Sequence, residues 1–282
     1  MERVTNPASG AHRRKGIFYQ LTEEEINQFE TLGYISLHDV LTEEELQTLD
    51  PWFDHFVSGK EAARMGKDFC DMSQPYGTPI EAFQLVNAML PSHYRPELVN
   101  NIFFQVATEI AKQLYREGEA AMDYEQFLAK KPGKKKAEFA MHQDLGYWPK
   151  TENTWTATFS LALSDSDLVN GCLQVVPGTN KEAELRKHVP QSYGDSEGSR
   201  EDSHTLVIEV KPSDKLVYLP VKRGSLTIHD ERIVHGSGGN ESPEWRKTYV
   251  MAFRDKKTIE IERKMGFTHS HNDEVNWEDI IH

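Results

Sequence analysis

Apolar and polar residues alternate from Thr154 to Leu163, with Ala162 as the one exception, and this run constrains the fold more than any other segment. Neighbouring side chains on a β-strand point to opposite faces, so the alternation predicts a strand with one apolar face. Four further strands are predicted between Pro, Gly and Asp residues, at 207–210, 215–219, 224–229 and 246–254. The second half of the chain is therefore predicted to consist of short strands.

The first half carries helix signals. Thr22 and Thr42 each precede three glutamates, a capping-box pattern that opens a helix, and apolar residues at helical spacing predict a third helix from Pro96 to Glu117. Helices followed by many strands indicate a mainly β, jelly-roll-type barrel with helices on one outer face. We expect a disordered tail over 1–17 and one domain over 18–282, helical at about 20–120 with its β core at about 125–255.

Three residues in the β region form a candidate metal site. His142 and Asp144 are two apart, so one strand would project both to the same side, and His235 would come from a neighbouring strand. Two imidazoles and one carboxylate can occupy one face of an octahedral metal, the arrangement typical of non-haem Fe(II) oxygenases. Arg246 follows eleven residues after His235 and carries a planar fork suited to a carboxylate.

Two other histidines stand beside carboxylates. His229 precedes Asp230 and Glu231, and we expect it to support the site structurally rather than to bind the metal. His271 repeats the His-x-Asp pattern with Asp273, but no strand pattern surrounds it. We expect His271 to lie in a solvated polar tail.

Flanking motifs resemble those of the phytanoyl-CoA dioxygenase family. The resemblance spans roughly residues 20 to 255, and four motifs occur in the family's order. They are FETLGY at 29–34 with LTEEEL at 41–46, HQDLGY at 142–147, NGCLQVVPGT at 170–179, and HGSG at 235–238 followed by Asn240 and Arg246.

The resemblance implies a double-stranded β-helix and an oxygenase that uses Fe(II), 2-oxoglutarate and O₂. It implies that His142, Asp144 and His235 are the iron ligands. It further implies that Arg246 and Ser237 bind 2-oxoglutarate, with Gln126 and Lys130 near other cosubstrate-facing positions. A carboxylate at position 144 favours hydroxylation, or a related oxidation, over halogenation. The expected activity is oxidation of a small metabolite with release of succinate and CO₂.

Three other segments have two interpretations each. Tyr147 and Trp148 either line the substrate pocket or pack at the barrel rim. The basic run from Lys130 to Lys136 is expected to be a solvated loop, with contact to an anionic substrate as the alternative. The polar segment from Gln191 to Ser203 is either a lid over the site or a surface insertion.

Composition excludes several classes of partner. A net charge of −13 argues against binding to nucleic acid or to anionic lipid, because both require clustered positive charge. No apolar run approaches the ~20 residues of a membrane span. The chain has only two cysteines and its N-terminal segment lacks an apolar core, so we expect a cytoplasmic protein. The oligomeric state cannot be read from the sequence.

Two other functions remain open at this stage. One is a non-catalytic cupin-like protein that binds a metal or a small acid, and the other is a cupin enzyme that uses another metal without 2-oxoglutarate. Intact His142, Asp144 and His235 argue against the first, and Arg246 argues against the second.

Overall fold

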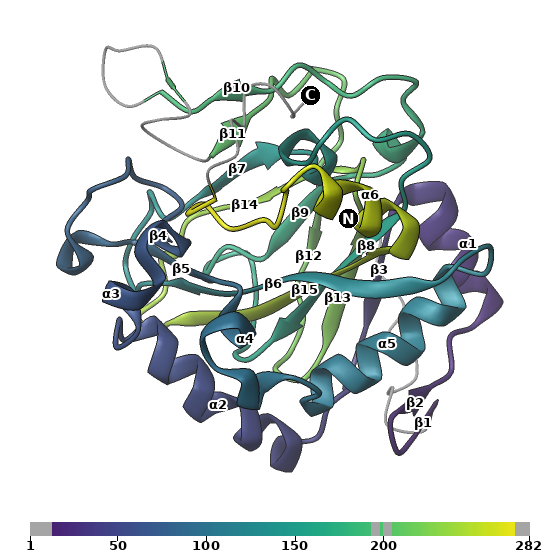
Figure 1. Cartoon of the computed structure of the whole chain (residues 1–282), viewed down its shortest axis with the longest axis horizontal. Helices are drawn as coiled ribbons and strands as arrows, with labels where there is room; N and C mark the ends of the chain where they lie inside the picture. The colour runs from purple at the N-terminus through teal and green to yellow at the C-terminus, as the bar shows by residue number, and fades with distance from the viewer. Residues whose placement is uncertain (1–12, 193–197, 200–204, 274–282) are drawn as a thin grey trace.

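The structure is a computed structural model that describes residues 13–192, 198–199 and 205–273. Its main element is a seven-stranded antiparallel sheet that runs through the centre of the molecule (Figure 1). In spatial order the strands are β3 (Tyr34–Leu37), β13 (Leu226–Asp230), β8 (Thr156–Ala162), β15 (Arg246–Asp255), β6 (Ala120–Lys130), β5 (Leu85–Met89) and β4 (Phe69–Asp71). The prediction of a mainly β protein is confirmed.

A smaller sheet faces the first. It contains, in order, β12 (Val217–Leu219), β9 (Leu173–Val176), β14 (Val234–Ser237) and β7 (Phe139–His142), all antiparallel. Two hairpins stand apart from both sheets: β1 (Arg14–Lys15) with β2 (Phe18–Tyr19), and β10 (Val189–Pro190) with β11 (Leu206–Val207). Residues of both large sheets line one shared cavity, so the site described below lies between them.

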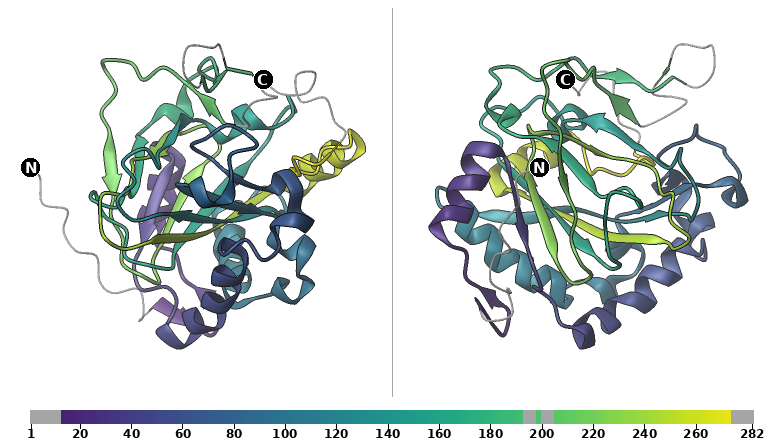
Figure 2. Two further views of the ribbon diagram at one scale, coloured as in Figure 1. Left: turned by 90° about the vertical axis from the view of Figure 1, so that its left-hand side faces the viewer. Right: turned by 180° about the vertical axis from the view of Figure 1, so that it is seen from behind.

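The long helices α1 (Glu23–Leu32), α2 (Glu43–Val57) and α5 (Ile102–Leu114) cover the opposite face of the seven-stranded sheet, as the views in Figure 2 show. The main core lies between this face and the long helices. The other helices are α3 (Ala62–Met65), α4 (Pro91–Tyr94) and α6 (Lys256–Lys264). Short 3-10 turns are η2 (Gly66–Asp68), η3 (Ile80–Ala82), η4 (Pro96–Leu98), η5 (Asp144–Tyr147) and η6 (Thr179–Lys181).

The sequence signals locate the first two helices well and the third less well. Thr22 and Thr42 form the predicted capping boxes at the starts of α1 and α2. The predicted helix from Pro96 is too long, because Asn100 adopts a left-handed φ of 64° and the Asn101 side chain caps α5. The Asn101 Oδ1 accepts the Phe104 amide at 3.0 Å, so α5 begins at Ile102.

Strand β8 shows why the alternation is so clean. Its apolar residues pack into the helix-covered core, while Thr158 and Ser160 face the cavity between the sheets. Both faces are buried. The polar face of the alternation therefore marks a cavity wall rather than a solvent-exposed surface.

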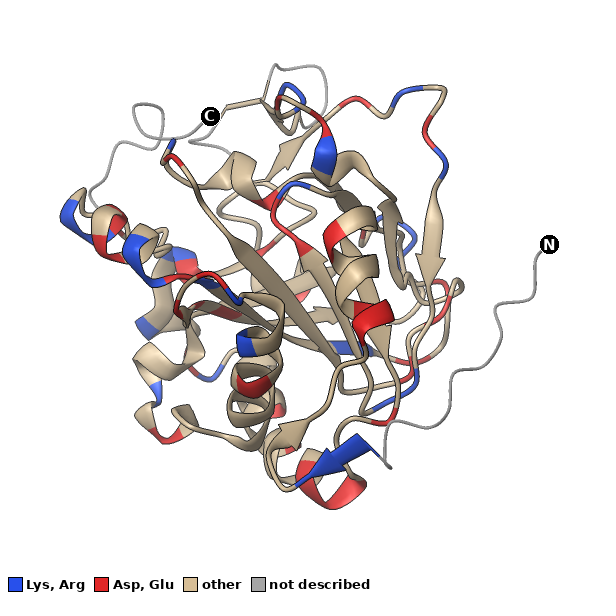
Figure 3. Cartoon of the chain, turned by 90° about the vertical axis from the view of Figure 1, so that its right-hand side faces the viewer, with Lys and Arg blue, Asp and Glu red and all other residues tan. Residues whose placement is uncertain are grey.

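The disordered tail predicted over 1–17 extends too far along the chain. Arg13 and Arg14 form ion pairs with Glu25 at 2.7 Å and with Glu45 at 2.5 Å, which fix β1 beside the acidic helix starts (Figure 3). Residues 1–12 lie outside the described residues, as do 193–197 and 200–203 of the segment predicted as a lid or an insertion. Among the described helices, none is long and apolar enough to span a bilayer.

Candidate metal centre and adjoining cavities

His142, Asp144 and His235 lie together at one end of the smaller sheet. The Asp144 Oδ1 is 3.3 Å from the His142 Nε2 and 3.4 Å from the His235 Nε2. These residues come together because β7 and β14 pair with His142 opposite His235. Within the described part of the chain, this is the one group of three such side chains close enough to hold a metal ion, with ligand atoms within 4.8 Å of one another.

The prediction that one strand carries both His142 and Asp144 is wrong. Strand β7 ends at His142, and Asp144 begins the 3-10 turn η5. Gln143 between them is fully buried, and its side chain donates to the Arg232 carbonyl at 2.6 Å. This bond fixes the turn that brings the carboxylate back toward the two imidazoles.

Backbone carbonyls orient both imidazoles. The His142 Nδ1 donates to the Ala140 carbonyl at 2.7 Å, and the His235 Nδ1 donates to the Ile233 carbonyl at 3.0 Å. Each Nε2 is thereby directed at Asp144. Burial and the neighbouring His235 lower the pKa of His142, which favours the neutral imidazole that binds a metal.

The second oxygen of Asp144 is held from the opposite sheet. The Asp144 Oδ2 accepts the Thr158 hydroxyl at 2.7 Å and lies 3.2 Å from the His229 Nε2. His229 thus contacts a candidate ligand and lies outside the cluster of three. Burial alone would raise the pKa of Asp144, but the charge of His235 and hydrogen bonds from the histidines hold it well below its usual value.

A cavity of about 490 Å³, here called the Arg246 cavity, adjoins the three residues. Arg246, Ser237, Gln126 and Thr248 also line it. The Arg246 side chain is buried, and the hydrogen bond from its Nε to the Ser166 Oγ is long, at 3.4 Å. No carboxylate among the described residues forms an ion pair with it. Burial lowers the pKa of Arg246 to about 10.

Lys130 does not line this cavity itself but contacts Ser237, which does. It lies opposite Arg246 in the pairing of β6 with β15, and its Nζ donates to the Ser237 Oγ at 2.7 Å and to the Gly238 carbonyl. Burial and the charge of Arg246 hold the pKa of Lys130 well below its usual value. Two buried basic side chains thus lie side by side, and a bound anion would favour their charged forms.

Thr248 was missed in the sequence. Its hydroxyl is buried and has no hydrogen-bond partner among the described residues. Two positions after Arg246 on a strand, it points to the same face, so the strand pattern could have located it.

A second cavity of about 640 Å³, here called the Asn87 cavity, opens on the other side of the same cluster. His142, Asp144, Gln126 and Thr158 line both cavities. Tyr147 and Trp148 line this second cavity. They also pack structurally: the Tyr147 hydroxyl bonds to both backbone groups of Leu206, and the Arg254 guanidinium lies 4.3 Å from the Trp148 ring centroid.

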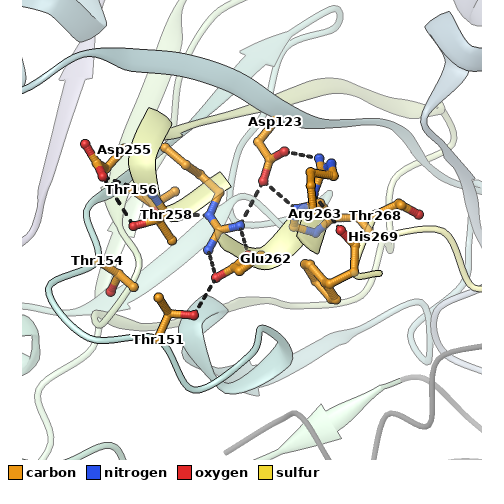
Figure 4. A network of polar contacts seen from close by, with 12 residues as sticks. Asp123, Thr151, Thr154, Thr156, Asp255, Thr258, Glu262, Arg263, Thr268 and His269 are labelled. Atoms are coloured by element: carbon orange, nitrogen blue, oxygen red, sulfur yellow. Dashed lines mark hydrogen bonds and ion pairs between the residues drawn. The ribbon is translucent and has the colours of Figure 1, made fainter. Parts of the chain in front are cut away.

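The expectation that His271 lies in a solvated tail is wrong. Phe267, His269 and His271 line the Asn87 cavity. Asp123 holds the segment that carries these three residues (Figure 4). Its carboxylate pairs with the His269 Nε2 at 2.8 Å, with the Arg254 guanidinium at 2.8 Å and with the Arg263 guanidinium. Contacts between residues so distant in sequence leave no local signal.

Comparison with known proteins agrees with this geometry. The family model "Phytanoyl-CoA dioxygenase (PhyH)" matches residues 29–248. The chain belongs to the phytanoyl-CoA dioxygenase family. The resemblance predicted from the motifs is therefore confirmed.

Individual relatives are distant. The chain is 25% identical to peroxisomal phytanoyl-CoA dioxygenase of Rattus norvegicus over 240 residues, 80% of this chain and 66% of that protein. It is 22% identical to ectoine dioxygenase of Bordetella bronchiseptica over 259 residues, 87% of this chain and 79% of that protein. Its matches to the rat and mouse phytanoyl-CoA dioxygenases span 66% and 35% of their lengths.

A solved structure shares the fold. EvdO2 from Micromonospora carbonacea var. aurantiaca, crystallised with 2-oxoglutarate, superposes with a TM-score of 0.67 at 21% identity. The superposition covers 86% of this chain and 94% of that chain.

Proposed function

We propose that this protein is an Fe(II)- and 2-oxoglutarate-dependent dioxygenase with a double-stranded β-helix core. It oxidises a small molecule by hydroxylation and releases succinate and CO₂. One observation carries the proposal: the Arg246 guanidinium is buried and has no carboxylate partner among the described residues, in the same cavity as His142, Asp144 and His235. A dicarboxylate that chelates a metal through one end would also give the Arg246 guanidinium a carboxylate partner at its other end.

The three candidate ligands fit iron. His142 and His235 each present Nε2, and Asp144 presents Oδ1, a donor set of two imidazoles and one carboxylate. Such a set leaves open positions for a bidentate keto acid and for O₂. Bound iron would supply the oxidation of substrate by O₂, coupled to loss of CO₂ from 2-oxoglutarate.

The protein's own contribution is orientation. Arg246 would hold the distal carboxylate of 2-oxoglutarate with a bidentate pair of hydrogen bonds. The hydroxyls of Ser237 and Thr248 line the same cavity, and Lys130 holds the Ser237 hydroxyl by a hydrogen bond from its Nζ. Gln126 lines both cavities, with its Oε1 accepting the Tyr124 hydroxyl at 2.6 Å. Tyr147 and Trp148 would contact the substrate in the Asn87 cavity.

The two alternatives explain less of the site. A non-catalytic binding protein has no need of a complete ligand triad whose carboxylate is fixed by Thr158 and His229. A cupin enzyme without 2-oxoglutarate leaves the buried Arg246 and Lys130 without an anion. We further propose a cytoplasmic location, supported by the presence of only two cysteines in the sequence, too few for a disulfide framework.

The test is a screen of pooled metabolites with Fe(II), ascorbate, 2-oxoglutarate and air, in which succinate is measured. We expect at least one pool to raise succinate formation above the rate without metabolite. The matched control is Asp144→Ala, which should show no stimulation in that pool. Equal succinate formation by the wild type and by Asp144→Ala in every pool would contradict the proposal.

A further inference from the structure

Asn87 lies on the face of β5 that looks into the Asn87 cavity. Successive residues of a strand point to opposite sides, and here Val86 and Ala88 pack into the helix-covered core. Asn87 and Met89 therefore face the other way, and both line the cavity that His142 and Asp144 also line. The Asn87 side chain has no solvent exposure.

The Asn87 amide is only half satisfied. Its Nδ2 donates to two sulfur atoms, the Met72 Sδ at 3.2 Å and the Cys70 Sγ at 3.8 Å. Its Oδ1 has no hydrogen-bond partner among the described residues. A buried amide oxygen without a partner is unfavourable, and natural proteins keep such groups where a ligand or another partner completes them.

The rest of this cavity is apolar or already paired. Aromatic rings and methionines supply much of its wall, including Phe139, Trp148 and Met89. Of its polar groups, the Gln126 Oε1 accepts from Tyr124, and the His269 Nε2 is bonded to Asp123. Among the residues that the structure describes, no Lys or Arg lines it. The cavity is thus largely apolar, and among its described lining residues the Asn87 Oδ1 is the one fully buried polar side-chain atom without a partner.

We infer that Asn87 is a specificity-determining residue, whose Oδ1 accepts a hydrogen bond from an N–H or O–H group of an uncharged, largely apolar ring substrate. This inference rests on the proposed function, because it takes the cavity beside the candidate iron ligands as the substrate site. An acceptor that is buried and otherwise unpaired discriminates strongly against a molecule that lacks the donor. Asn87 therefore selects the substrate and also sets the orientation in which the substrate faces His142 and Asp144.

The test uses indole and 1-methylindole, a matched pair of uncharged rings with and without an N–H donor. Binding to the protein without iron is measured by ligand-observed NMR titration, so failure of turnover and failure of this inference are separate results. The wild type should bind indole roughly tenfold more tightly than 1-methylindole. Asn87→Leu keeps a similar volume and should bring the ratio close to one, whereas Asn87→Asp should keep the preference for indole.

Asn180→Leu is the control. Asn180 is also buried, and its Oδ1 has no partner within the described part of the chain, but it does not line the cavity, so its variant should keep the wild-type ratio. Melting temperatures of all variants show whether they are folded. A wild type that binds no indole or prefers 1-methylindole overturns the inference. A folded Asn87→Leu that keeps the wild-type ratio does the same.

Discussion

Replacing Arg246 with Ala should weaken 2-oxoglutarate binding by roughly 100-fold. Burial lowers the pKa of Arg246 from 12.5 to about 10, which corresponds to about 3 kcal/mol of unfavourable desolvation of the charge. A bound carboxylate offsets this cost through two charge-assisted hydrogen bonds, and about 3 kcal/mol corresponds to roughly 100-fold in the dissociation constant. Arg246→Lys should recover only part of the affinity, because an ammonium group cannot form the bidentate pair.

The same reasoning predicts the opposite effect on the protein without ligand. Arg246 lies opposite Lys130 across β15 and β6 and has no carboxylate partner among the described residues, so its charge destabilises the empty site. Arg246→Met keeps the volume and removes the charge. This variant should unfold at or above the wild-type temperature while binding 2-oxoglutarate poorly.

Calorimetric titration of 2-oxoglutarate in the presence of Mn(II) measures the affinity without turnover. Arg116→Ala is the control, because Arg116 is exposed and pairs with Glu23 on the surface. It should leave the dissociation constant unchanged. An Arg246→Ala protein that binds 2-oxoglutarate as tightly as the wild type would refute the role assigned to this cavity.

Three further predictions follow from the site and its supports. His142→Ala, Asp144→Ala and His235→Ala should each lose Fe(II) binding, measured by equilibrium dialysis, and retention of full binding by one variant would remove that residue from the ligand set. Thr158→Val should lower metal affinity roughly 10- to 100-fold in the same assay, because Thr158 holds the Asp144 Oδ2; an unchanged affinity would show that this bond is dispensable. Asp123→Asn should lose about 3–5 kcal/mol of stability at pH 7, because it breaks a buried charge network. Burial opposes the charge on Asp123, but His269, Arg254 and Arg263 hold its pKa well below the usual value, so this stabilisation is complete above about pH 4 and is lost as pH falls further. Urea unfolding at several pH values should show the wild type and Asp123→Asn converging in acid, and a constant difference down to pH 2 would contradict this.

The sequence predicts the elements whose signals are local. The capping boxes at Thr22 and Thr42 place the first two helices because each involves residues three apart. The alternation around Phe159 locates β8, and the spacing of His142, Asp144 and His235 predicts a cluster that the structure brings together. These patterns depend on neighbours along the chain or on short motifs.

The parts of the fold and of the site that the sequence did not predict depend on long-range contacts. Strand β4 pairs with β5 at the edge of the main sheet, although 58–79, which contains β4, carries no clear strand pattern. Asn87 lines the cavity only because one face of β5 is turned toward it. His269 lines the same cavity because Asp123, far earlier in the chain, bonds to it. The turn at Asp144 was also hidden, because the buried bond of Gln143 to Arg232 spans nearly ninety residues.

The claim that His142, Asp144 and His235 hold iron while Arg246 holds the far carboxylate of 2-oxoglutarate is tested most directly by crystallography. Crystals grown without O₂ with Fe(II) and 2-oxoglutarate would be measured at the iron absorption edge. We predict one anomalous peak between the three side chains, with the cosubstrate running from that peak to Arg246. A peak at another site, or a 2-oxoglutarate carboxylate away from Arg246, would contradict the account.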